Sequence, residues 1–154
     1  MPTSIREQVL TAFEARLGMV VAANLPGVIT VYRGLRKPVP DGKLPALVMK
    51  ASPVSSDQES AAVTRNVERI TVTAFLKNNA SDAELHRQGV DLGAAILRAV
   101  EADPTLGGIA VDTNLTEADQ DEADGEGVGG LGDVFFAFAV EFWTRPGDPY
   151  TAAP

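Results

Sequence analysis

The chain of 154 residues holds few of the side chains that usually carry out catalysis. It has no cysteine, and His86 is its only histidine. Thiolate zinc sites, cysteine nucleophiles and a disulfide framework are therefore excluded. A Ser-His-Asp arrangement would depend on His86, yet no Gly-x-Ser-x-Gly turn exposes a serine. No glycine-rich segment stands between a strand and a helix to cradle a nucleotide phosphate. We expect an exposed structural His86, no cofactor and no enzymatic activity.

Seven of the 21 acidic residues lie between Asp112 and Glu126, where there is no basic residue. The other 14 acidic residues nearly balance the 13 basic ones, so the net charge of -8 belongs mainly to this segment. With Asp119 as the first ligand of a calcium loop, the fifth, sixth and twelfth positions would be Ala123, Asp124 and Gly130, which do not fit. The pattern favours a solvated loop. A module that binds divalent metal through this acidic loop stays an alternative.

The remaining body has one local concentration of basic residues, Arg33, Arg36, Lys37 and Lys43. Such cations are able to contact phosphates, since each neutralised phosphate contributes salt-dependent, sequence-independent affinity. The acidity of the whole chain argues against tight independent binding of DNA. We favour solvated side chains or salt bridges at an interface, with contact to nucleic acid as the alternative.

Two helices are predicted from their starting residues. Ser4 with Glu7, and Ser81 with Glu84, have the spacing of a reciprocal capping pair. The first helix begins near Ile5, and its apolar residues recur at helical spacing. The second helix ends around Ala102, because Pro104 follows.

The strands are predicted from alternation and β-branched content. In the segment 64–77, one face of the predicted strand carries Ile70, Val72, Ala74 and Leu76, and the other carries Arg69, Thr71, Thr73 and Phe75. This alternation indicates a strand with one face on a core. The predicted strands are Val28–Arg33, Ala46–Ala51, Thr64–Lys77, Ile109–Leu115 and Asp133–Thr144. Between them we expect an irregular excursion from Gly34 to Pro45, a mobile loop over 52–63, and a flexible acidic, glycine-rich loop over 116–132.

This order of elements favours a single α+β domain over residues 1–154, with an antiparallel or mixed sheet of about 4–5 strands and two helices packed on one face. The last strand is the most apolar. Val134, Phe136, Phe138, Val140 and Phe142 should face the helices. The opposite set begins with Phe135 and ends with Trp143, and it is too apolar for a freely solvated face. We therefore expect something to cover part of it.

Several short segments, in order, resemble a family of small tail-completion proteins of long-tailed bacteriophages. These segments are Ser4–Glu7, Pro26–Val28 with Val31–Arg33, Leu44–Leu47, Thr64–Arg65, Asp103–Gly108 and Thr144–Pro149. The family includes tail terminators similar to the lambda minor tail protein U. The resemblance implies an α+β structural protein of the virion that forms a ring, expected to be a hexamer, at the head-proximal end of the tail tube. Such a ring stops polymerisation of the tube and presents a surface for joining the head.

The resemblance also implies partners and places. The partners would be other copies of the chain, the tail-tube protein and neck or connector proteins, with DNA passing non-specifically through the lumen. The protein would reside in the virion, and in the host cytoplasm during assembly. A neck or head-completion protein of the same particle is the related alternative. We expect no membrane-spanning helix, because the longest uncharged run is too short.

On this hypothesis, residues of the second sheet face and of the closing segment form the contact between subunits. The expected interface residues are Phe75, Phe135, Trp143, Asp148 and Tyr150. The basic residues Arg33, Arg36, Lys37 and Lys43 would contact the lumen or a neighbouring subunit.

Overall fold

The structure is a computed structural model, and it describes residues 2–21, 29–35, 37–77, 80–122 and 131–154. The helices are α1 (Ile5–Leu17) and α2 (Asp82–Glu101), and the strands are β1 (Thr30–Arg33), β2 (Ala46–Gln58), β3 (Thr64–Lys77), β4 (Asp112–Glu122), β5 (Leu131–Arg145) and β6 (Asp148–Ala152). Short 3-10 turns lie at Asp41–Lys43 and Leu106–Gly108.

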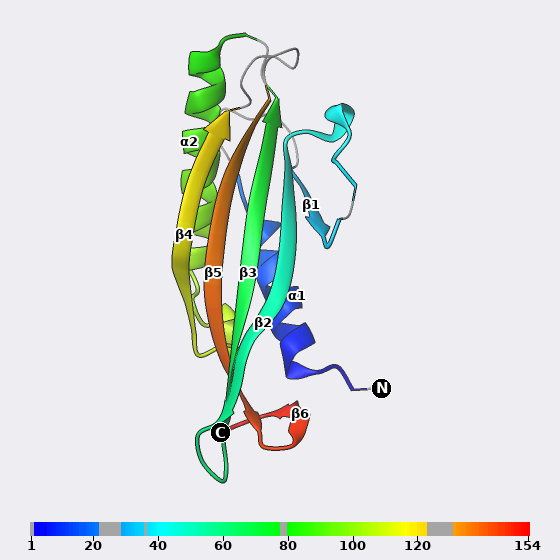
Figure 1. The fold of residues 1–154 in the computed structure, drawn as a ribbon, viewed down its shortest axis with the longest axis vertical. Helices are drawn as coiled ribbons and strands as arrows, with labels where there is room; N and C mark the ends of the chain where they lie inside the picture. Colours follow the sequence, from blue (N-terminus) through cyan, green and yellow to red (C-terminus); the bar gives the residue numbers. More distant parts are fainter. Residues whose placement is uncertain (1, 22–28, 36, 78–79, 123–130) are drawn as a thin grey trace.

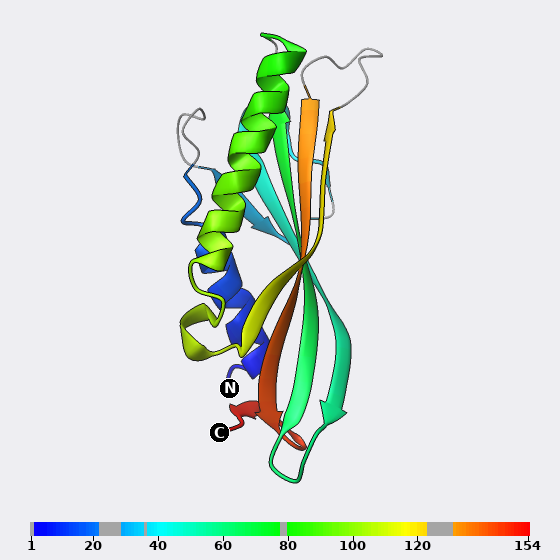
Figure 2. The same ribbon diagram turned by 90° about the vertical axis from the view of Figure 1, so that its left-hand side faces the viewer.

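The strands form one mixed sheet in the order β1-β2-β3-β5-β4, and β6 pairs with the end of β5. The β1–β2 pair is parallel, and the other pairs are antiparallel. The strands are long and strongly twisted (Figure 1). Both helices lie on the same side of the sheet (Figure 2). The predicted α+β class, with a mixed sheet and two helices on one face, is confirmed.

Each helix begins at the predicted serine. The Ser4 hydroxyl accepts a hydrogen bond from the Glu7 amide at 3.1 Å, and Ser81 accepts one from Glu84 at 3.1 Å. The two glutamate carboxylates have arginine partners instead: Glu7 contacts Arg33, and Glu84 contacts Arg87. A charged guanidinium is a stronger donor than a neutral backbone amide. Each serine therefore caps its helix, while the glutamate side chain takes up an ion pair.

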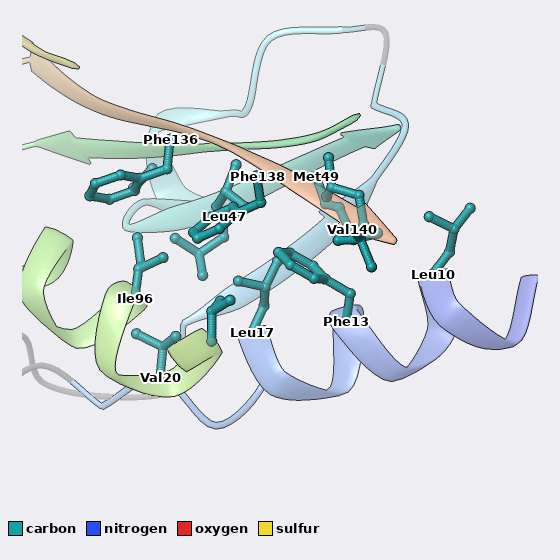
Figure 3. Close-up of a cluster of buried hydrophobic side chains, with 14 of the residues drawn as sticks. Leu10, Phe13, Leu17, Val20, Leu47, Met49, Ile96, Phe136, Phe138 and Val140 are labelled. Carbon is teal, nitrogen blue, oxygen red and sulfur yellow. The ribbon is translucent and has the colours of Figure 1, made fainter. Parts of the chain in front are cut away.

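The core lies between the two helices and one face of the sheet. Phe13 of α1 meets Phe138 of β5 edge to face, with ring centroids 5.5 Å apart. The labelled side chains from α1, α2, β2 and β5 point into this space (Figure 3). All residues predicted to face the helices from the two long strands are buried: Ile70, Val72, Ala74, Leu76, Val134, Phe136, Phe138, Val140 and Phe142. The predicted assignment of the sheet faces is confirmed.

Close approach of α2 to the sheet depends on a glycine. Gly93 is buried on the helix face toward β5, and a Cβ atom there would lie 3.2 Å from the Phe136 ring. The absence of a side chain lets the helix backbone sit close to this aromatic residue.

The prediction of a mobile loop over residues 52–63 is wrong. Strand β2 continues to Gln58 and pairs with β3, so only a short turn connects them. The register shifts between Pro53 and Ser55, which marks a β-bulge. The serine-rich composition of this half of β2 carries no strand signal. It becomes a strand because β3 offers it a continuous line of backbone partners.

The predicted boundaries around the acidic loop are also wrong. Strand β4 begins at Asp112 rather than Ile109 and runs to Glu122, while β5 begins at Leu131. Paired residues include Asp119 with Phe135. The backbone of β5 needs hydrogen-bond partners along its full length, and acidic side chains are compatible with a strand at the sheet edge. Residues 123–130 of the predicted loop lie outside the described residues, and the short strand β6 was not predicted.

The two faces predict different consequences for removing an aromatic residue. Phe138→Ala should lower the free energy of unfolding by about 3 to 5 kcal/mol, because it leaves a cavity beside Phe13. Trp143 is 37% exposed, so Trp143→Ala should cost much less and chiefly weaken self-association. Denaturant melts of both variants measure the difference. The opposite ranking would contradict the face assignment.

Candidate interaction surface on the open sheet face

Three of the predicted interface aromatics, Phe75, Phe135 and Trp143, lie on the sheet face away from the helices, but Trp143 is far from the other two. Strand register places Phe135 beside Thr73 on β3, and Trp143 beside Arg65. Phe75 lies one row beyond Phe135, next to Asp133. Trp143 is eight residues further along β5 than Phe135, about 26 Å at the usual rise per residue. The face therefore has two separate aromatic regions.

The first region is a groove formed between the excursion 34–45 and the outer face of β2 and β3. Its volume is about 500 Å³. It is lined by Leu35, Lys37, Pro38, Val39, Leu44, Val48, Lys50, Phe75, Leu76 and Gly132. We call it the lysine-rimmed groove. Its walls are mainly apolar, and the excursion covers part of the sheet, so Phe75 is half-buried within its own chain.

Below the groove, the open face is more polar than its aromatic ends suggest. Arg65 pairs with Glu141, and Arg69 pairs with Glu117 at 3.3 Å. The first pair joins the neighbouring strands β3 and β5, where opposite charges stabilise the pairing, and the second reaches across β5 to β4. Both pairs are partly exposed to solvent. The expectation that this whole face is too apolar for solvent is therefore wrong for its middle. A partner would find apolar contacts chiefly at the groove and at Trp143.

The closing segment contributes two of the predicted interface residues. Asp148 Oδ1 accepts a hydrogen bond from the Tyr150 amide at 3.0 Å. Hydrogen bonds from the Thr151 hydroxyl and then this amide hold the pKa of Asp148 below its ordinary value. Asp148 thus orders its own turn. Tyr150 is 47% exposed and is the more accessible member of the pair.

The basic residues are also divided by the fold. Arg33 donates two hydrogen bonds of 2.6 Å to the carboxylate of Glu7, and it also lies 3.9 Å from Glu14. Arg33 therefore ties β1 to α1 rather than standing free for a ligand. Lys37 lies in the groove, and Lys43 is exposed at the end of a 3-10 turn. Arg36 lies outside the described residues.

Sequence analysis missed the ion pair that anchors α1 to β3. The Glu68 carboxylate is only 2% exposed, although it lies on the core side of β3. Arg6 of α1 holds it with Nε at 3.0 Å from Oε2 and Nη2 at 2.7 Å from Oε1. Glu68 lies two residues before Ile70, so its side chain points to the same buried face of the strand. A carboxylate at a core-facing position of a strand was the signal that a cation had to lie opposite.

The other polar candidates of the sequence are His86 and the acidic residues. His86 is exposed on α2, and Gln120 lies beside it with Nε2 at 3.4 Å from Nδ1. Over the described ranges, no three His, Asp or Glu side chains gather to hold a metal ion. In the same part of the chain, neither helix combines the length and apolar character that crossing a bilayer requires.

Comparison with known proteins adds no family to this description. Neither a protein-family model nor a curated protein sequence matches the chain.

Removing Arg6 should destabilise the protein, because the buried Glu68 carboxylate would lose its cation. Breaking a fully buried pair costs about 3 to 5 kcal/mol, and the exposure of Arg6 should reduce this to about 2 to 3 kcal/mol. Urea melts of Arg6→Ala measure the loss. Arg87→Ala, which breaks the exposed pair with Glu84, is the control and should cost under about 0.5 kcal/mol. Equal losses would contradict a special role for the Arg6–Glu68 pair.

The Arg33–Glu7 pair predicts a pH dependence. The pKa of Glu7 is lowered chiefly by hydrogen bonding from Arg33. Since this pKa is lower in the folded than in the unfolded state, the pair stabilises the protein above the unfolded value, and that stability is lost as pH falls through the folded value. Arg33→Ala should raise the pKa of Glu7, measured by NMR titration, and Arg87→Ala should leave it unchanged. An unchanged pKa in Arg33→Ala would contradict the assignment.

Proposed function

We propose that this protein is a structural subunit that forms a ring at the head-proximal end of a long phage-type tail and terminates the tail tube. This specific role is supported by the short sequence segments that occur in the same order as in tail-completion proteins. The observation that carries the role of an assembling subunit is the open sheet face. Both helices cover the opposite face, and this one presents an apolar groove and an exposed Trp143 at two separate places.

The shape of the chain suits a ring of subunits placed side by side. Strand β5 has 15 residues, which corresponds to about 50 Å of extended backbone. The subunit is correspondingly elongated along its strands (Figure 1). Elongated subunits arranged around an axis present their ends to two different partners. In the proposed ring, one end meets the last layer of the tail tube and the other meets the neck.

The isolated protein and purified tail tubes together test this function. Multi-angle light scattering should give a mass several times the chain's 16.2 kDa. Electron microscopy should show the rings on one end of tubes, and added protein should stop tube elongation. A strict monomer that does not bind tube ends would contradict the proposal. Rings that bind heads but not tubes would indicate the neck protein instead.

A further inference from the structure

The two lateral sides of the sheet carry surfaces of opposite charge. Toward one side, the lysine-rimmed groove lies over the open face of β2 and β3. At the other edge lies β4, which ends the strand order and has no further strand beyond it among those described. The β1–β2 side and the β4 side are opposite sides of one sheet (Figure 1). The chain thus offers two different surfaces to two different neighbours.

The groove combines an apolar interior with two exposed lysines. Leu35, Val39 and Phe75 line its walls, and Lys37 and Lys50 lie on its rim. Both lysines are exposed, and neither makes an ion pair or a hydrogen bond with a side chain in the described part of the chain. A surface of this kind fits an apolar segment flanked by negative charge.

The β4 edge has the complementary composition. Val90 of α2 is 50% exposed, and together with Leu97 and Ala118 it lines a shallow apolar groove of about 410 Å³ between α2 and β4. Glu117 and Asp119 are exposed beside it on β4. We call these five residues the acidic edge. Glu117 contacts Arg69 at 3.3 Å on the surface, where such a pair is weak.

We propose that the acidic edge of one copy docks against the lysine-rimmed groove of the next copy. This rests on the proposed function, because it names the contact that would build the ring. The contact joins two different surfaces. An open row of copies therefore has an unoccupied groove at one end and an unoccupied acidic edge at the other until a ring closes. The apolar centres exclude water, and the charges around them set the orientation and reject contacts between like edges.

Charge reversal at each edge tests this contact in the full chain. Glu117→Lys with Asp119→Lys makes both edges basic, and Lys37→Glu with Lys50→Glu makes both acidic. Each double variant should self-associate at least about tenfold more weakly than the natural chain. A mixture of the two should regain association, since every contact then joins opposite charges in alternating order. Sedimentation velocity at equal total concentration measures all three samples.

The control carries the same change in charge at a distance from both edges. Asp57 and Glu59 are exposed near the end of the β2–β3 hairpin, and Asp57→Lys with Glu59→Lys should leave association unchanged. Circular dichroism melts verify that each variant folds. Raising the salt concentration should weaken the association of the natural chain, because salt screens charges at the rim of the contact.

Three results would overturn the proposal, and they differ in what they leave standing. If the natural chain forms rings but the mixture associates no better than its components, this contact is wrong while the proposed function stands. If Lys37→Glu with Lys50→Glu still forms rings but loses binding to tubes, the groove binds the tube rather than another copy. If the natural chain is a monomer that does not bind tubes, both the contact and the function fail.

Discussion

Antiparallel pairing of β3 with β5 is the constraint on which the rest of the structure depends. The ladder runs from Thr64 opposite Thr144 to Lys77 opposite Leu131. Because these two strands are central, β2 and β4 add to their outer sides, and both helices pack on their common apolar face. The segments that pair are far apart in the chain, so forming this ladder closes a long loop before it is stabilised. Burial of the apolar face offsets that entropy.

Two ion pairs then fix how α1 sits on this sheet. Apolar packing alone is not directional, so a helix on an apolar face could slide or rotate with little change in buried area. Arg6 reaches Glu68 on β3, and Arg33 of β1 reaches Glu7 on the same helix. These contacts have defined geometry and come from two different strands. We infer that they select one position for α1 at the cost of burying the charge of Glu68.

The predictable features of this chain are the local ones. Alternation in β3 and β5 predicts which residues face the core, because successive side chains on a strand point to opposite faces of the sheet. The second half of β2 and the acidic part of β4 carry no such alternation, and they become strands through their neighbours. The lysine-rimmed groove could not be predicted from the sequence either, because it depends on how the excursion 34–45 packs against the sheet. Phe75, Phe135 and Trp143 were assigned to the correct face, but their separation follows from the register.

The acidic edge connects the solubility of the subunit with its proposed assembly. A long edge strand such as β4 exposes unpaired backbone groups and invites pairing with any other strand. Negative side chains along β4 oppose that pairing between identical edges, since two copies of Glu117 and Asp119 would repel each other. The same charges attract a surface that carries Lys37 and Lys50. One set of residues can therefore prevent indiscriminate aggregation and still permit a single directed contact, which is the property that a closed ring of identical subunits requires.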